Sequence, residues 1–227
     1  MDITQLILDD HYEQRRRFAM LEQVGRGNPA VLGALWARLA VFLEVHAAAE
    51  EQIFYPELLR VTSGAAEGET LVAIHDHNDI RDAIAAVPEG EPGSGQWFTA
   101  VAAANLANSD HMAEEEREGL TDFRRMASLQ LRHDLAVSFA AFEAQHFAGV
   151  PVLDKDPAAY VREAEEREGV RPAPARAQND QDDQNGQGEQ DGQGQDTQGQ
   201  DTQDQDAQGR DGRSADGSLS IGSLKGR

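Results

Sequence analysis

The sequence predicts an all-α fold: an antiparallel four-helix bundle with an extra C-terminal helix, followed by a disordered tail. Apolar residues recur at three- and four-residue steps from residue 2 to about residue 148, which is the spacing of one face of a helix. No stretch alternates apolar and polar residues as a half-buried strand does. After Pro151 the composition becomes strongly polar, so we assign residues 1–150 to the bundle and residues 151–227 to the tail.

The first two helices have clear sequence boundaries. The first is expected from about Ile3 to Val24, because two glycines follow it closely. The second is expected to begin at Asn28-Pro29, a capping residue followed by a proline suited to the first helical turn. Pro56 cannot donate a backbone hydrogen bond, so we expect the second helix to kink there, to end there or to lose a hydrogen bond.

Three more helices are expected, at about residues 67–87, 96–126 and 129–147. The last of them is amphipathic and is expected to pack outside the bundle. Beyond it, residues 160–169 have a charged, helix-compatible sequence. Residues 178–212 are almost wholly Gln, Asp, Gly, Asn and Thr, and we predict disorder because such a sequence buries too little apolar area to offset backbone entropy.

The composition excludes several classes of protein and of site. The chain has no cysteine, so any metal must be bound by imidazole and oxygen ligands. The net charge is −21, and both the bundle and the tail are acidic, so we expect no nucleic acid and no anionic membrane as partner. We expect a cytoplasmic protein, because no apolar run approaches the ~20 residues of a membrane span and the N-terminus lacks the basic segment of a secretory signal.

Two histidine–glutamate pairs are the sequence features that most directly indicate a function. His46 and Glu50, and likewise His111 and Glu115, are four residues apart on apolar helix stripes, so each pair shares one helix face. Two further inward-facing histidines are expected on the other helices, His11 and His77. A buried carboxylate costs several kcal/mol unless a cation compensates it. The pattern therefore predicts a metal site in the bundle core.

The ligand types leave the metal open among zinc, manganese and iron. Six protein ligands on one ion would leave no position for a substrate. Distributed over two ions with the glutamates bridging, the same ligands give an open dinuclear centre, which helical bundles support well.

In order and context, these motifs resemble the hemerythrin-like proteins with an HHE cation-binding domain. The resemblance covers about residues 1–126 and includes the segments Asp10-His11-Tyr12-Glu13, Glu50-Glu51-Gln52-Ile53-Phe54-Tyr55-Pro56 and His77-Asn78-Asp79-Ile80-Arg81. It implies a non-haem diiron centre, two iron ions with an oxo or hydroxo bridge. The implied terminal ligands are His11, His46, His77 and His111, and the implied bridging ligands are Glu50 and Glu115.

Two positions depart from the oxygen-carrying hemerythrins. Arg81 stands where those proteins have a second histidine on this helix, and Glu115 stands in place of a longer-spaced aspartate. Fewer nitrogen ligands favour defence against peroxide or nitric oxide over reversible oxygen carriage.

Tyr55 is a candidate for an additional ligand, because a phenolate is a good donor to ferric iron. In an ideal helix Tyr55 lies about 180° round from His46, so only a distortion near Pro56 would turn it inward. Without that distortion it would be a packing residue at the end of the bundle.

The remaining polar residues receive simpler interpretations. We expect His75 to be a surface residue or a hydrogen-bond donor near the site, and His133 and His146 to be surface or packing residues. Glu51 and Glu114 are expected to be solvated. Asn108 is either a hydrogen-bond donor near the site or a polar packing residue, and Arg81 is expected either to pair with a carboxylate or to gate the site.

Two main functions follow from these predictions. The first is a diiron protein that binds or turns over a small diatomic or peroxidic ligand (dioxygen, nitric oxide or hydrogen peroxide) with an unidentified reductant, which includes catalase- or peroxidase-like activity. The second is an iron or redox sensor without turnover, for which the acidic tail would bind a protein partner. A purely structural bundle is the third. No phosphate-binding loop, nucleophile elbow or dinucleotide fingerprint competes with these readings.

Overall fold

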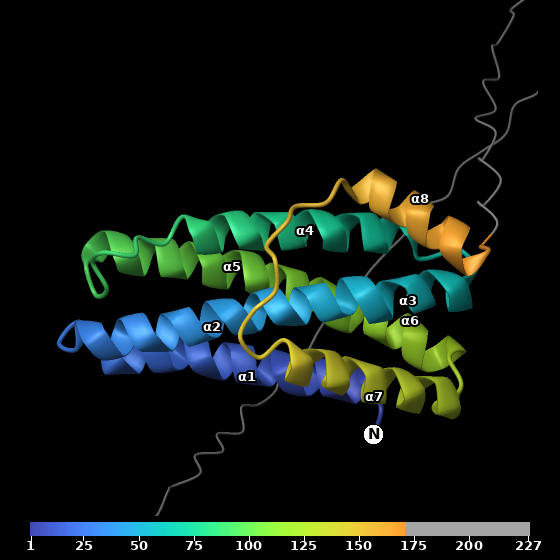
Figure 1. The fold of residues 1–227 in the computed structure, drawn as a ribbon, viewed down its shortest axis with the longest axis horizontal. Helices are drawn as coiled ribbons and strands as arrows, with labels where there is room; N and C mark the ends of the chain where they lie inside the picture. Colours follow the sequence, from blue (N-terminus) through green and yellow to red (C-terminus); the bar gives the residue numbers. More distant parts are fainter. Residues whose placement is uncertain (171–227) are drawn as a thin grey trace, which may run out of the picture. The chain divides into compact units, whose positions relative to one another are not determined.

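The computed structural model describes residues 1–170, in which the chain is helical and contains no strand (Figure 1). The elements in chain order are α1 (Ile3–Val24), α2 (Pro29–Ala49), a π-helical segment (Glu50–Phe54), α3 (Tyr55–Thr62), α4 (Glu67–Ala85), α5 (Gly95–Arg117), α6 (Gly119–Met126), α7 (Leu129–Gln145) and α8 (Pro157–Glu168). The expected all-α class is confirmed. The predicted disorder of residues 178–212 lies outside the described residues.

Side-chain caps explain where most of these helices begin. A capping oxygen accepts a hydrogen bond from a backbone N–H of the first turn, which has no partner inside the helix. Such caps start five helices, α1, α2, α5, α7 and α8, through Asp2, Asn28, Ser94, Ser128 and Asp156.

Two apolar clusters fill the bundle and leave a polar layer between them. One contains Ile3, Ile7, Phe54, Leu58, Phe123 and Phe139, and the other contains Phe18, Leu32, Trp36, Leu39 and Trp97. The histidine and glutamate residues singled out above fall between these clusters in sequence on each helix. Apolar packing on both sides therefore fixes the helices that carry them.

The second helix continues past Pro56, so of the three outcomes expected there, a kink, an end or a lost hydrogen bond, an end is excluded. The chain stays helical to Thr62, and its distortion is a π-helical turn at Glu50–Phe54, before the proline. In this turn the Tyr55 N–H bonds to the Glu50 carbonyl, five residues back instead of four. The next carbonyl, that of Glu51, would then pair with residue 56, and proline has no N–H to offer it.

The folded part extends past residue 150, where the composition placed the domain boundary. Helix α7 packs on α1 and α2, and α8 packs on α3 and α4. Val161 and Ala164 of α8 are buried against Leu59. Between α7 and α8 the chain crosses the bundle, and Asn78 holds it by accepting from the Lys155 N–H (3.0 Å) and donating to the Lys155 carbonyl (2.7 Å).

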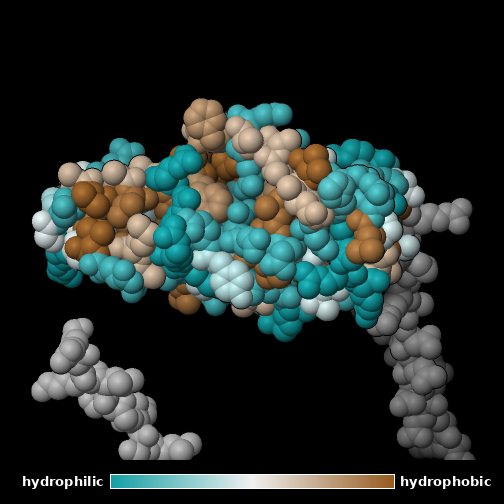
Figure 2. All heavy atoms as spheres, turned by 90° about the horizontal axis from the view of Figure 1, so that it is seen from below, coloured by the Kyte–Doolittle hydropathy of each residue, from teal (hydrophilic) through white to brown (hydrophobic). Residues whose placement is uncertain are grey.

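One helical stretch in the described residues, Pro29–Thr62, is long and apolar enough to span a membrane, with a window of mean hydropathy 1.5. The sequence expectation that no such run exists is therefore corrected. In all, 39% of that window is buried, including Leu32, Leu39 and Leu43 in the bundle core. Figure 2 shows hydrophobic side chains interspersed with hydrophilic ones on one face of the molecule.

Candidate metal centre

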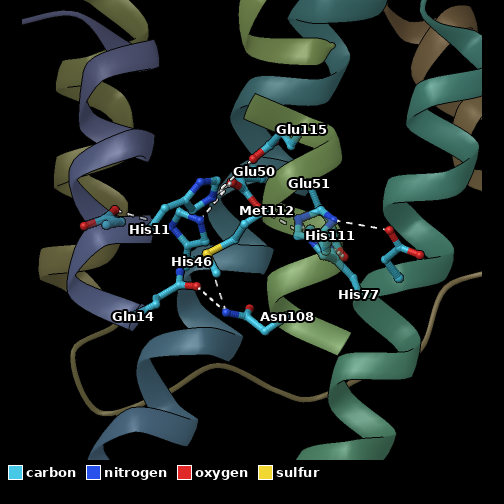
Figure 3. Close-up of polar contacts among 12 residues, drawn as sticks. His11, Gln14, His46, Glu50, Glu51, His77, Asn108, His111, Met112 and Glu115 are labelled. Atoms are coloured by element: carbon cyan, nitrogen blue, oxygen red, sulfur yellow. Dashed lines mark hydrogen bonds and ion pairs between the residues drawn. The ribbon is translucent and has the colours of Figure 1, made fainter. Parts of the chain in front are cut away.

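Six ionisable side chains from α1, α2, the π-helical segment, α4 and α5 meet in the middle of the bundle (Figure 3). Each is at most 6% exposed, and they are His11, His46, Glu50, His77, His111 and Glu115. The structure thus brings together all six side chains that the sequence spacing selected.

The carboxylate of Glu50 lies between two pairs of histidines. Its Oε1 is 2.9 Å from Nε2 of His46 and 3.9 Å from Nε2 of His11. Its Oε2 is 3.3 Å from Nε2 of His77 and 4.0 Å from Nε2 of His111. Each oxygen therefore faces a different pair of imidazole nitrogens.

Glu115 approaches the same centre from α5. Its Oε2 is 3.3 Å from Nε2 of His11. On the other side of the centre, Nε2 of His77 and Nε2 of His111 are 3.0 Å apart. Two imidazole nitrogens this close must share a proton or a cation, because two bare lone pairs would repel each other.

Besides their short mutual distances, the inner residues have unpaired polar atoms that a metal ion would satisfy. Several atoms of the site are buried and have no hydrogen-bond partner among residues 1–170: Nε2 of His11 and His46, both carboxylate oxygens of Glu50 and of Glu115, and the Tyr55 hydroxyl. Leaving such groups unpaired costs about 1–3 kcal/mol each, more for charged ones. Three groups of donor atoms in the described residues lie close enough to hold an ion. Two of them are fully buried, His11 with His46 and Glu50, and Glu50 with His77 and His111; the third, Asp10 with His46 and Glu143, is only partly buried.

Each inner histidine has an outer carboxylate beside its second ring nitrogen, Nδ1. Glu116 is 2.9 Å from Nδ1 of His11, and Glu51 is 2.8 Å from Nδ1 of His77.

The other two histidines follow the same arrangement at slightly longer distances. Asp10 lies 3.4 Å from Nδ1 of His46, and Asp76 lies 3.5 Å from Nδ1 of His111. A carboxylate that accepts the Nδ1 proton fixes the ring and leaves the Nε2 lone pair for a metal.

These four outer carboxylates form a closed ring around the centre. Asp10 on α1 serves the histidine of α2, and Glu51 on the π-helical segment serves that of α4. Asp76 on α4 serves the histidine of α5, and Glu116 on α5 serves that of α1. Every helix of the centre therefore supports a ligand carried by its neighbour.

The surroundings perturb the pKa values of the inner residues. Burial alone would lower the pKa of His77, but the nearby carboxylates of Glu50 and Glu51 raise it to about 9. For His46, burial likewise opposes the charge, and Glu50 and Asp10 raise its pKa well above the usual value. Burial opposes the charge of Glu50, and the adjacent His46 and His77 hold the pKa of Glu50 well below its usual value. Protons and metal cations therefore compete for the same Nε2 atoms.

Glu51 is buried, which corrects the expectation that it is solvated. Its side chain is 1% exposed and contacts three cationic groups: His77, Arg81 at 2.7 Å and Lys155 at 2.6 Å. Burial raises its pKa, but these partners lower it to about 2 overall. Arg81 thus pairs with a carboxylate, one of its two expected roles, while Glu114 is exposed as expected.

The π-helical turn also decides where Tyr55 points. One extra residue in the turn reduces the angle between Tyr55 and His46 from about 180° to about 80°. Tyr55 is 1% exposed, and its ring centroid lies 5.8 Å from that of His77. Burial and the charges of Glu115 and Glu50 raise the pKa of Tyr55 well above its usual value. The required distortion exists, but it precedes Pro56.

The other polar residues have partners outside the six inner side chains. Asn108 donates to Gln14 at 2.9 Å, and both side chains are buried, so Asn108 is a core polar residue. His75 and His133 are exposed, and His146 stacks on Phe142, as surface and packing residues do.

Sequence reasoning missed the outer carboxylates, although a signal was present. Each is adjacent in sequence to an inner residue, in the pairs Asp10-His11, Glu50-Glu51, Asp76-His77 and Glu115-Glu116. It also missed Lys155, whose contact with Glu51 joins residues more than a hundred positions apart and leaves no local pattern.

Comparison with known proteins agrees with this geometry. The sequence matches the hemerythrin HHE cation binding domain over residues 2–121, more than half of the chain. No significant match was found among curated proteins or among solved structures. The matched range contains all six inner residues and the four outer carboxylates. With its four histidines and two glutamates gathered in a helical core, the chain belongs to the hemerythrin HHE cation-binding family.

Proposed function

We propose that the protein holds two iron ions in this centre and binds or turns over a small oxidant there, such as hydrogen peroxide, nitric oxide or dioxygen. Family membership and the buried histidine–glutamate groups support cation binding. The imidazole and carboxylate donors suit iron, manganese and zinc, and of these only iron and manganese would supply redox chemistry.

The position of Glu50 is the observation that favours two ions over one. Its two oxygens face separate histidine pairs, so one ion would be held by His11 and His46 and the other by His77 and His111. Glu50 would bridge them. Glu115, with both oxygens unpaired, is the second bridging candidate.

The number of ligands leaves room for a substrate. Two six-coordinate ions offer about twelve positions, and four histidines with two bridging carboxylates fill about eight. Bound iron would supply one-electron redox chemistry and an open position for a small molecule. The chain supplies the rest: the outer carboxylates hold the imidazoles in place, and the two apolar clusters limit access of water.

We include Tyr55 in the proposed ligand set. Its buried, unpaired hydroxyl lies on the same side of the helix as Glu50. A bound cation would offset the burial and the carboxylate charges that now raise its pKa. If Tyr55 binds ferric iron, the iron-loaded protein will have a broad visible absorption band that Tyr55→Phe removes without loss of iron.

Metal analysis and oxidant consumption test the proposed function together. We expect about two iron ions per chain in the purified protein, and consumption of hydrogen peroxide or nitric oxide faster than with free iron. Glu50→Ala should lose both properties, whereas Glu22→Gln, on the exposed face of α1, should keep both. An iron-loaded protein that consumes neither oxidant above the free-iron control would refute turnover.

One observation favours the second candidate function, an iron or redox sensor. Lys155 contacts the outer carboxylate Glu51, and Tyr160 donates to the Glu51 carbonyl, so the segment that leads to residues 171–227 touches the centre's supporting shell. Removing residues 171–227 distinguishes the two functions, because the described bundle with α8 stays complete. An oxidant-consuming protein keeps its turnover, whereas a sensor keeps its metal and loses binding to its partner.

A further inference from the structure

A pocket of about 130 Å³ lies beside the proposed centre, between α4 and the end of α5 with α6. Exposed residues line its outer part, among them Glu114, Glu118 and Val72. Its inner part is lined by Tyr55, His111 and Glu115. The pocket therefore extends from the surface to residues of the centre.

The charged side chains that line the pocket are carboxylates, and a histidine, His111, lies at its inner end. Glu69 and Asp76 on α4 face Glu114, Glu115 and Glu118 of the α5 region, and no lysine or arginine from the described part of the chain lines the pocket. Burial and the nearby Asp122 and Glu118 raise the pKa of Glu69, which agrees with a concentrated negative field. A cleft lined by one sign of charge raises the local concentration of counter-ions.

The inner end of the pocket presents oxygen atoms that have no partner. Glu115 is 6% exposed and neither of its carboxylate oxygens accepts a hydrogen bond, and the hydroxyl of Tyr55, 1% exposed, is also unpaired. Such buried oxygens suit a hard or borderline divalent cation. The volume corresponds to about four water molecules at ~30 Å³ each, enough for a cation that keeps part of its hydration shell.

We propose that this pocket is the entry route of divalent cations to the centre. Glu69, Glu114 and Glu118 attract the hydrated ion at the outer part, and the ion passes to Glu115, where protein oxygens begin to replace its water. The inference rests on the proposed metal centre and adds how the metal reaches it. The same field would disfavour entry of anions while leaving neutral molecules unaffected.

The rate of metal uptake tests the route. Cobalt(II) is mixed with the metal-depleted full-length protein in a stopped-flow instrument, and its visible absorption is followed. The triple variant Glu69→Gln, Glu114→Gln, Glu118→Gln is compared with the control Glu22→Gln, Glu89→Gln, Glu91→Gln. The control removes the same charge at exposed sites near the α1–α2 and α4–α5 loops, at the opposite end of the bundle from α3 and α6 (Figure 1).

We expect the pocket variant to take up cobalt about tenfold more slowly at low salt, and the control to match the wild-type protein. Added salt should narrow the difference, and the final amount of bound cobalt should be equal in all three. Val72→Lys, which places a positive charge in the pocket, should slow uptake, whereas Val31→Lys on exposed α2 surface should not.

The possible outcomes distinguish an error in the proposed entry route from an error in the proposed metal centre. Equal uptake rates in the pocket variants and their controls, with normal final binding, would overturn the entry route and leave the metal centre intact. Failure of the wild-type protein to bind cobalt at all would overturn the centre and the route with it.

Discussion

The outer carboxylates make a prediction specific to this arrangement: each should affect only one of the two proposed ions. Glu51 supports His77, which belongs to the His77–His111 pair, and Glu116 supports His11, which belongs to the His11–His46 pair. Glu51→Gln should therefore weaken one metal-binding step and Glu116→Gln the other. Glutamine keeps the size of the side chain and removes its charge, so the comparison isolates electrostatic support of the imidazole.

The burial of each outer carboxylate determines how much metal affinity we expect its substitution to remove. Removing an outer carboxylate from a metal-bound histidine costs about tenfold to hundredfold in affinity, or about 1.4–2.7 kcal/mol. Glu51 is 1% exposed and also holds Arg81 and Lys155, so we expect its loss to lie at the upper end. Glu116 is 28% exposed, so solvent screens its charge and we expect a loss near tenfold.

Competition between the protein and a chromophoric chelator for cobalt(II) measures the two steps. Glu22→Gln serves as a control for the general loss of negative charge, because Glu22 is exposed on α1. Circular dichroism of the metal-depleted variants checks that they fold, since Glu51→Gln removes the negative charge beside the buried Arg81.

Two results would refute the reasoning. If Glu51→Gln and Glu116→Gln weaken both steps equally, the carboxylates act through overall charge or stability and not through individual imidazoles. If neither variant differs from Glu22→Gln, the contacts between Nδ1 and the carboxylates do not support metal binding.

Three further predictions concern the fold and its protonation. Tyr160→Phe leaves the Glu51 carbonyl without the hydroxyl that donates to it at 2.5 Å, and should lower the free energy of unfolding by about 1–3 kcal/mol in denaturant titrations. Pro56→Ala in the Tyr160→Phe variant should recover part of this loss, because alanine supplies a backbone N–H at position 56. If the effects of the two substitutions on the free energy of unfolding are purely additive, this explanation is wrong. Metal binding at neutral pH should release protons, because the pKa of His77 near 9 keeps it protonated until a cation displaces the proton, and calorimetry in buffers of different ionisation enthalpy should find at least about one proton per chain. Burial and Asp10 raise the pKa of Glu143 to about 7 from an unfolded value near 4.5, so the stability linked to this group is complete below pH 4.5 and is lost as the pH rises through 7. Glu143→Gln should accordingly raise the melting temperature of the metal-depleted protein more at pH 8 than at pH 4, and an equal effect at both values would exclude the shift.

Local spacing was enough to predict the inner residues of the site. Residues four apart share a helix face, and a histidine or glutamate on an apolar stripe must face the core with its neighbours. This reasoning requires no knowledge of how the helices pack. It identified the six side chains that meet between the apolar clusters, and the observed bounds of α1, Ile3–Val24, agree with the prediction.

Local residue spacing could not predict the π-helical turn, because the turn depends on contacts between residues that are remote in sequence. The turn leaves the Glu51 carbonyl without a backbone donor, and the hydroxyl that compensates comes from Tyr160 on α8, in a stretch assigned to the tail. The proline predicted a distortion of the helix but not its kind or its position. The inward turn of Tyr55 follows from the kind of distortion, which rotates the chain by one extra residue.

The ring of outer carboxylates has a simple geometric origin. Successive residues on a helix are rotated by about 100°, so the neighbour of an inward-pointing ligand points sideways, toward an adjacent helix. The ring uses the residue before the ligand on α1 and α4, and the residue after it on the π-helical segment and α5. Helices joined by short loops and packed side by side run in opposite directions. Seen from one end of the bundle, successive residues turn clockwise along a helix that runs away from the viewer and anticlockwise along one that runs towards the viewer.

Alternating between the preceding and the following residue therefore keeps all four carboxylates turned the same way around the bundle. One acidic residue beside an inner residue of each helical segment, on alternating sides along the chain, is thus a sequence pattern that predicts a closed ring. The same rule gives a direct consequence: moving one outer carboxylate to the other side of its ligand would aim it at the wrong helix. Exchanging the neighbours of Glu50, as in Ala49→Glu with Glu51→Ala, should therefore fail to restore the affinity that Glu51→Ala loses, although the net charge is unchanged.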